Sequence, residues 1–231
     1  MKERQIALYD IDKTSYKGFL VGDLVNSQFE NKIISTQTYD AVNNDIESYR
    51  DGKIDYETFA QQFLEHWVFG LKGKSIREIS TQTEEFFRLE QRKIYPFVKP
   101  SINLLTPTHD TYFVTAGPQF GAEQVAKLSH ATGFVSTIFQ TDDGVFTGSM
   151  ISLAYSRDKK TAILHLIENH DMKKSIALGD SRGDQEMLAS VQYPICINPE
   201  DPKFREEAIR QGWTIALPEE VLGIIEDILQ E

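Results

Sequence analysis

Apolar residues follow two different periodicities along the chain, and the change between them predicts the organisation of the fold. Residues 6–9 form an unbroken apolar run, which is typical of a strand buried on both faces of a parallel sheet. Helical spacing dominates from residue 17 to residue 95, and after residue 96 strand-like and helix-like stretches alternate. A lone buried strand is not stable, so we expect the first strand to pair with the later ones.

The segment between residues 17 and 95 contains no convincing strand. Tyr56, Phe59, Phe63 and Trp67 recur at helical spacing, and we favour a core role for these aromatic rings over a ligand cage. Ser75 precedes a further helical pattern, and Glu78 follows at the spacing of a capping box. The segment is therefore predicted to be a helical insertion.

The rest of the chain predicts a doubly wound α/β domain. The turn signal Asp142-Asp143-Gly144 lies between two apolar stretches and predicts a small hairpin. We predict strands at 5–10, 111–115, 134–139, 175–178, 193–197 and 213–215, and helices near 99–105, 119–130, 159–167, 203–211 and 218–229. The expected domains are an α/β core (1–16 and 96–231) and a helical cap (17–95).

Composition and charge limit the classes of partner. The chain has 231 residues, of which 40% are hydrophobic and 26% charged, as in an ordinary globular protein. A formal net charge of −11 argues against nucleic acid or an anionic membrane as the main partner. No apolar run approaches the ~18–20 residues of a membrane span, and we expect a cytoplasmic protein. The single cysteine, Cys196, lies in an apolar run and is expected to be buried and inert.

Acidic residues follow the first predicted strand directly. Asp10 and Asp12 are two residues apart, so in extended geometry their side chains point the same way and repel each other. A divalent cation such as Mg²⁺ would relieve this repulsion. The alternative is a solvated Asp-x-Asp turn.

Further polar residues follow other predicted strands. Thr115 ends the second strand, and Asp180 and Asp184 follow the strand that ends at residue 178. Ligands of open parallel sheets bind outside the carboxyl ends of the strands, so these groups are expected to meet. Lys159 or Lys160, at the start of a helix, could add a cation, which would complete the groups that phosphoryl transfer requires.

These motifs resemble those of the haloacid dehalogenase-like phosphatase superfamily. The resemblance is carried by Asp10-Ile-Asp-Lys-Thr14, by Thr115, by a lysine at a helix start and by Gly179-Asp-Ser-Arg-Gly-Asp184. The position of the helical segment, together with Ile197-Asn-Pro-Glu200 and Gln211-Gly-Trp213, is similar to subfamily IB, which contains phosphoserine phosphatase.

The resemblance implies a Mg²⁺-dependent phosphatase that acts on a small phosphorylated metabolite. Asp10 would be the nucleophile that forms an aspartyl phosphate, and Asp12 the general acid and base. The metal would be held by Asp10, the backbone carbonyl of Asp12, Asp180 and Asp184, the last directly or through water.

The same resemblance implies which groups bind the phosphate. Thr115 and the backbone N–H groups after it, including that of Ala116, would bind its oxygens. Lys160 is preferred over Lys159 as the phosphate-binding lysine because Leu164 follows it at four residues, as in phosphoserine phosphatases.

Other activities and some departures from the pattern remain open. A phosphotransferase or mutase would use the same residues, whereas a dehalogenase would have no use for Asp12 or Asp180, and a non-catalytic regulatory relative would be expected to lack some of them. Lys13 and Ser15 depart from the usual first motif. No cap residue matches the serine-binding groups of phosphoserine phosphatase. Arg50, Lys53 and Arg182 are candidates for binding a substrate carboxylate or a second anionic group, and the favoured alternative for each is a solvated surface charge.

Overall fold

The sheet has the first strand at its centre. A computed structural model describes residues 4–231, and within them seven strands form one sheet in the order β4-β3-β2-β1-β5-β6-β7. Neighbouring strands are parallel except in the β3–β4 hairpin, which confirms the predicted α/β class and the pairing of the first strand. The strands are β1 (Gln5–Tyr9), β2 (His109–Pro118), β3 (Gly133–Asp142), β4 (Val145–Ile151), β5 (Asp171–Gly179), β6 (Tyr193–Ile197) and β7 (Thr214–Ala216).

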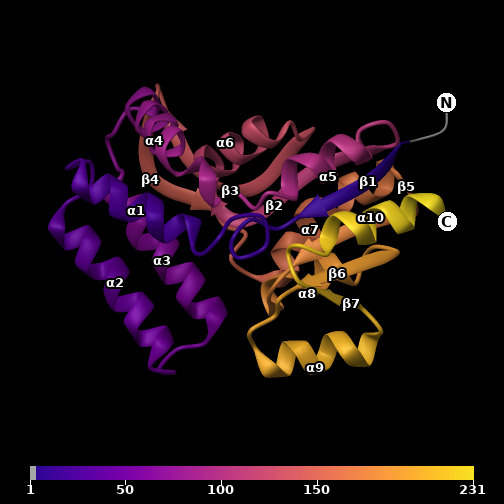
Figure 1. Ribbon diagram of the computed structural model, residues 1–231. Coiled ribbons are helices and arrows are strands. Elements are labelled where there is room, and N and C mark those ends of the chain that lie inside the picture. The colour runs from indigo at the N-terminus through magenta and orange to yellow at the C-terminus, as the bar shows by residue number, and fades with distance from the viewer. Residues whose placement is uncertain (1–3) are drawn as a thin grey trace.

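Helices cover both faces of this sheet (Figure 1). Ala7 and Tyr9 of β1 pack into the core cluster under α5, α6 and α10, whereas Ile6 and Leu8 pack into a second cluster under α7, α8 and α9. The unbroken apolar run of β1 is thus explained, because each of its faces is buried. These helices are α5 (Val98–Leu105), α6 (Gln119–Ser129), α7 (Ser156–Asn169), α8 (Gln185–Leu188), α9 (Pro202–Gln211) and α10 (Val221–Gln230).

The predicted helical segment gathers at one side of the sheet (Figure 1). Side chains of Ser35, Asp55 and Ser75 each accept a backbone N–H from the first turn of α2, α3 and α4, which explains where these helices begin. The helices are α1 (Leu20–Glu30), α2 (Thr36–Arg50), α3 (Tyr56–Gly70) and α4 (Ile76–Glu90), followed by the 3₁₀ turn η1 (Gln91–Lys93). Its division from the core as a separate domain stays a prediction, and we call residues 17–95 the cap.

Trp67 of α3 fixes the cap to the core. Its ring is fully buried in T-shaped contacts with Phe120 and Phe139 of the core, and its Nε1 donates to Gln28 Oε1 at 2.7 Å. The backbone of residues 73–76 also hydrogen-bonds along the outer edge of β4. Sequence periodicity did not predict this added edge pairing.

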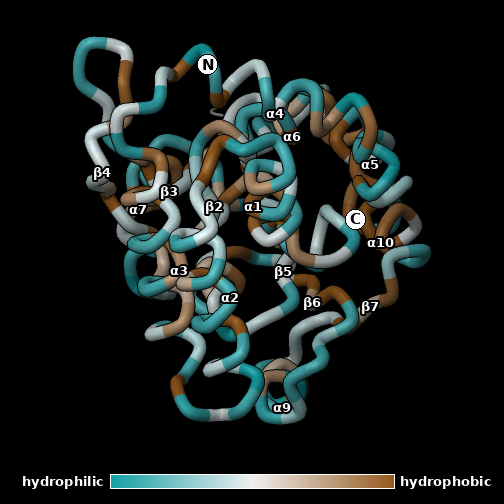
Figure 2. Tube along the Cα trace, turned by 90° about the vertical axis from the view of Figure 1, so that its left-hand side faces the viewer, coloured by the Kyte–Doolittle hydropathy of each residue, from teal (hydrophilic) through white to brown (hydrophobic). Residues whose placement is uncertain are grey.

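Apolar residues concentrate in the sheet and on the inner faces of the helices. In Figure 2 the strand β6 is brown, whereas the surface helix α9 is mainly teal. Cys196 of β6 is fully buried, and burial raises the pKa of its thiol to about 12, as expected for an inert cysteine. Over residues 4–231 no helix combines the length and the apolar character that a membrane crossing requires.

His109 of β2 makes the stability of the fold depend on pH. The ring is 1% exposed, its Nδ1 lies 2.8 Å from Thr108 Oγ1, and its Nε2 lies 2.9 Å from the carbonyl oxygen of Lys174. Burial lowers its pKa, so the folded protein holds it neutral while the unfolded chain protonates near pH 6.5. The stability it contributes is present above that pH and is lost as pH falls below it.

We therefore expect the free energy of unfolding to fall more steeply with acid in the wild type than in His109→Gln. The excess loss should appear as pH falls below about 6.5, where the unfolded chain takes up the proton. Urea unfolding at several pH values measures it. Equal slopes for the two proteins would show that His109 is not held neutral.

Candidate active site

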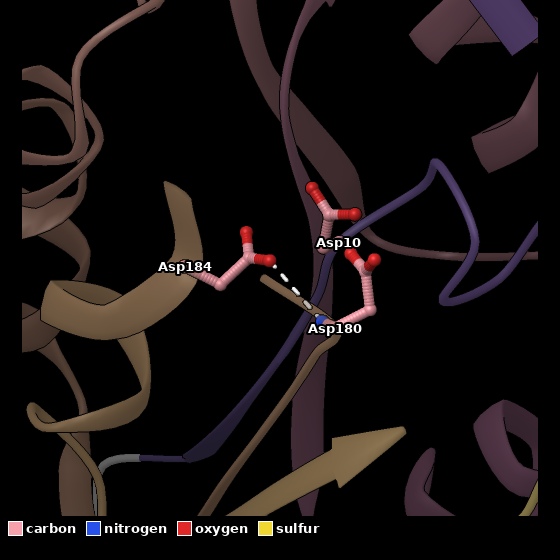
Figure 3. A group of neighbouring side chains, drawn as sticks. All are labelled: Asp10, Asp180 and Asp184. Carbon is pink, nitrogen blue, oxygen red and sulfur yellow. Dashed lines mark hydrogen bonds between the residues drawn. The ribbon is translucent and has the colours of Figure 1, made fainter. Parts of the chain in front are cut away.

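Three carboxylates converge at the carboxyl ends of β1 and β5. Asp10 follows β1, and Asp180 and Asp184 follow β5, which is its neighbour in the sheet (Figure 3). One ligand oxygen from each lies within 4.8 Å of the others. The strand ends thus bring together residues separated by more than 160 positions, as the sequence predicts.

The loop after β1 is fixed by its own backbone. The Asp10 N–H donates to the Leu178 carbonyl at 2.9 Å, and Ser15 Oγ donates to the Asp10 carbonyl at 2.7 Å. Lys13 has a φ of 57°, which turns the chain sharply, and its Nζ pairs with Glu200 at 2.6 Å. Asp12 Oδ1 accepts the Leu20 N–H at 2.5 Å, so this carboxylate is held at the start of α1.

Asp184 is anchored by the turn that carries Asp180. Its Oδ2 accepts the N–H groups of Asp180 and Ser181, each at 3.2 Å, and the Ser181 hydroxyl at 3.1 Å. A Cβ at Gly179 would lie 2.5 Å from the Cβ of Asp184. Glycine at the end of β5 therefore permits Asp184 to reach the site.

Lys159, and not Lys160, is the lysine in the cluster. Lys159 is buried, and its Nζ donates to Asp10 Oδ1 at 2.8 Å and to Asp184 Oδ1 at 2.7 Å. Lys160 lies at the surface, where it pairs with Glu186 at 2.7 Å. The preference for Lys160 is thus corrected.

The rotation of α7 explains the correction. Successive residues of a helix are about 100° apart, so only one of two adjacent lysines can point inward. Ile163, four residues after Lys159, is fully buried, whereas Leu164, four residues after Lys160, is 43% exposed. The spacing between Lys160 and Leu164 therefore belongs to the outer face of the helix.

The four carboxyl groups are crowded and largely removed from water. Burial, followed by the charge of Asp184, raises the pKa of Asp10 and of Asp180 well above the ordinary range. Burial also raises the pKa of Asp12 to about 6, against the lowering effect of the Leu20 N–H bond. Burial alone would lower the pKa of Lys159, but the charges of Asp10 and Asp184 outweigh burial and raise this pKa well above its usual value. Repulsion between like charges thus adds to the effect of burial at Asp10 and Asp180.

This donor set fits Mg²⁺, which prefers carboxylate oxygens and is bound by few protein ligands. Asp10, Asp180 and Asp184 could supply them. A divalent cation beside these residues would offset their mutual repulsion.

The end of β2 lies on the other side of Asp10. Thr115 is buried, and its Oγ1 accepts the Gly117 N–H at 3.0 Å, so its hydroxyl proton remains available for a ligand oxygen. Ala116 and Gly117 line the same pocket as Asp12. The residues that follow Thr115 in β2 therefore lie beside Asp12.

Tyr56 is a site residue that the sequence did not indicate as functional. It begins α3, and a Cβ placed at Gly183 would lie 3.2–3.4 Å from its ring and hydroxyl. Burial raises its pKa, and the carboxylates of Asp184 and Asp10 add to this effect. In the sequence, Tyr56 stands out only as one of several aromatic residues at helical spacing, and this spacing is also typical of ordinary core residues.

A model of the haloacid dehalogenase-like hydrolase family matches residues 7–189, which include every site residue described above. The chain belongs to this family. The haloacid dehalogenase-like resemblance deduced from the four motifs is thus confirmed.

Proteins of known name or of known structure are similar to this chain. Phosphoserine phosphatase SerB1 of Mycobacterium tuberculosis is 28% identical over 150 residues, covering 63% of this chain and 48% of that protein, so the chain spans about half the length of this curated relative. A Bordetella pertussis protein of unknown function has a TM-score of 0.77 at 21% identity, covering 94% of this chain and all of that one. A substrate-bound phosphoserine phosphatase has a TM-score of 0.65 at 15% identity, with 94% of both chains covered. At such identities the structures establish the fold alone.

The two lysines allow a matched test. Lys159→Met leaves Asp10 and Asp184 without their buried partner and should lower the free energy of unfolding in EDTA by about 3–5 kcal/mol. Lys160→Met breaks a surface pair and should change it by about 0–1 kcal/mol. Urea unfolding of both variants measures the difference, and equal effects would contradict the assignment of Lys159 to the site.

Proposed function

We propose that this protein is a Mg²⁺-dependent phosphomonoester hydrolase that acts on a small phosphorylated metabolite through an aspartyl phosphate on Asp10. The observation that carries the proposal is the position of Asp10, 2.8 Å from the Lys159 ammonium and grouped with Asp180 and Asp184. A nucleophilic carboxylate, acidic metal ligands and a cation are the groups that phosphoryl transfer needs. Family membership supports the same chemistry. We also propose a cytoplasmic location.

Asp10 attacks phosphorus, and its oxygen forms the new P–O bond while the bond to the leaving oxygen breaks. A carboxylate needs no separate base to act as a nucleophile once it is ionised. Lys159 favours the ionised form of Asp10 because the ammonium lies within hydrogen-bond distance of Oδ1. One relative of the same fold was solved as a phospho-aspartyl intermediate analogue of phosphoserine phosphatase, and this supports the assignment.

Asp12 gives a proton to the leaving oxygen and later takes one from the water that attacks the aspartyl phosphate. A carboxyl group with a pKa of about 6 is suited to both steps near neutral pH. Its Oδ1 accepts the Leu20 N–H, which holds this carboxyl group in position at the start of α1.

The phosphate is bound by the Thr115 hydroxyl, by the Ala116 N–H and by Lys159, which takes the role first given to Lys160. These groups are donors, and their positive ends offset the charge that develops on the phosphoryl oxygens. Mg²⁺ would be held by Asp10, the backbone carbonyl of Asp12, Asp180 and Asp184, and would supply further charge neutralisation. The cap excludes bulk water from the reacting groups.

Asp10→Asn should abolish turnover and leave the fold intact, because the amide keeps the shape of the side chain but not its nucleophilicity. Phosphate release from an aryl phosphate in Mg²⁺ or in EDTA, with urea unfolding as the control for folding, measures both. Wild-type release should require Mg²⁺. Retention of activity in Asp10→Asn would exclude Asp10 as the nucleophile.

Asp180→Ala should weaken Mg²⁺ binding by about tenfold or more, since it removes one of three clustered carboxylates. In EDTA the same variant should be no less stable than the wild type, because a carboxyl group that crowds Asp10 and Asp184 is gone. Calorimetric Mg²⁺ titration measures the first effect and urea unfolding the second. Asp40→Ala, at an exposed position of α2, is the control, and an unchanged Mg²⁺ affinity in Asp180→Ala would show that the metal site lies elsewhere.

A further inference from the structure

A narrow pocket lies beside Asp12, between the cap and the end of β2. Its walls come from α3 of the cap, from the chain around the start of α1 and from Ala116 and Gly117. Its volume is about 30 Å³, which is room for about two water molecules. Among residues 4–231, Asp12 is the one charged residue that lines it, and the other nine lining residues are apolar, aromatic or glycine.

The pocket lies where the proposed reaction puts the leaving group. In-line attack by Asp10 expels the leaving oxygen on the opposite side of phosphorus. Asp12 must be within hydrogen-bond reach of that oxygen to protonate it. The alcohol part of the substrate therefore extends from Asp12 into this pocket, and this step rests on the proposed function.

The aromatic wall of the pocket is held in place by its own packing. The ring centroid of Phe63 lies 5.6 Å from that of Phe19 and 5.7 Å from that of Phe59, both edge-on. Phe59 also stacks on Tyr49 at 4.9 Å. Rings packed in this way present a fixed apolar surface, which a leaving-group carboxylate would have to face without a partner.

The cations that could have bound a substrate carboxylate lie outside the pocket. Lys53 pairs with Asp51 at 2.8 Å, and Arg182 pairs with Asp201 at 2.8 Å. Arg50, the third candidate, is exposed at the end of α2, and none of the three lines the pocket. An amino-acid leaving group would thus bury its carboxylate against Phe59 and Phe63 without a compensating cation.

We infer that the leaving group is a small alcohol that carries no carboxylate and has a mainly apolar surface, and that phosphoserine is a poor substrate for this chain. The lining residues select against negative charge, and the volume selects against size. The cap residues that set this preference are Phe19, Tyr56, Phe59, Ala60 and Phe63.

A panel of phosphate esters with Mg²⁺ tests this inference. Methyl, propyl and butyl phosphate have leaving groups of similar intrinsic reactivity, so differences in kcat/KM among them report on the pocket. From methyl to propyl phosphate, kcat/KM should rise by up to about fourfold per methylene. The kcat/KM for phosphoserine should fall about tenfold or more below that for propyl phosphate. Faster turnover of phosphoserine than of propyl phosphate would overturn the inference.

Ala60→Val provides the structural test, because it adds two methyl groups to the pocket wall. We expect kcat/KM for propyl phosphate to fall by about tenfold and that for methyl phosphate to fall much less. Ala41→Val, in the neighbouring helix α2 and away from the pocket, should leave both values near those of the wild type. Parallel losses for both esters in Ala60→Val, in a protein that unfolds like the wild type, would show that the alcohol does not enter this pocket.

Failure of the proposed function would look different. If no ester released phosphate, the phosphatase proposal would be wrong, and binding of non-hydrolysable phosphonates would still report on the pocket. Calorimetry should give tighter binding for propylphosphonate than for methylphosphonate. The reverse order would overturn the apolar pocket independently of turnover.

Discussion

Repulsion among four crowded carboxyl groups, two of them buried, is the constraint on which this site depends. Asp10, Asp12, Asp180 and Asp184 meet at the ends of two adjacent strands, and one buried lysine faces them. Such a cluster persists only because hydrogen bonds from fixed backbone N–H groups and the Lys159 ammonium hold it. A divalent cation could relieve the crowding of Asp10, Asp180 and Asp184, while burial raises the pKa of Asp12 to about 6.

The sheet provides the rigidity that this arrangement needs. β1 lies at the centre, with apolar side chains buried on alternate faces, so Asp10 cannot move without disturbing both layers of helices. The cap is joined to this core by Trp67 and by backbone bonds between residues 73–76 and β4. Phe63 of the wall beside Asp12 packs edge-on against Trp67, so the proposed substrate selection and the attachment of the cap depend on side chains in contact.

Family membership and substrate preference therefore depend on different parts of the molecule. The motif residues at the strand ends are those of the haloacid dehalogenase-like family, and the family model covers them. The apolar pocket is formed mainly by cap residues, while the structures of phosphoserine phosphatases with the same fold are about 15% identical to this chain. At such distances the residues that line a pocket change freely while the fold persists.

The sequence by itself determined the order of strands and helices, the hairpin and the convergence of Asp10, Asp180 and Asp184. These features follow from local periodicity and from the rule that parallel strands end at one edge of a sheet. Only the tertiary structure decided between Lys159 and Lys160, because the packing of α7 sets which helical face points inward. It also brought Tyr56 to Gly183 and closed an apolar pocket beside Asp12, since contacts between cap and core join segments with no local pattern in common.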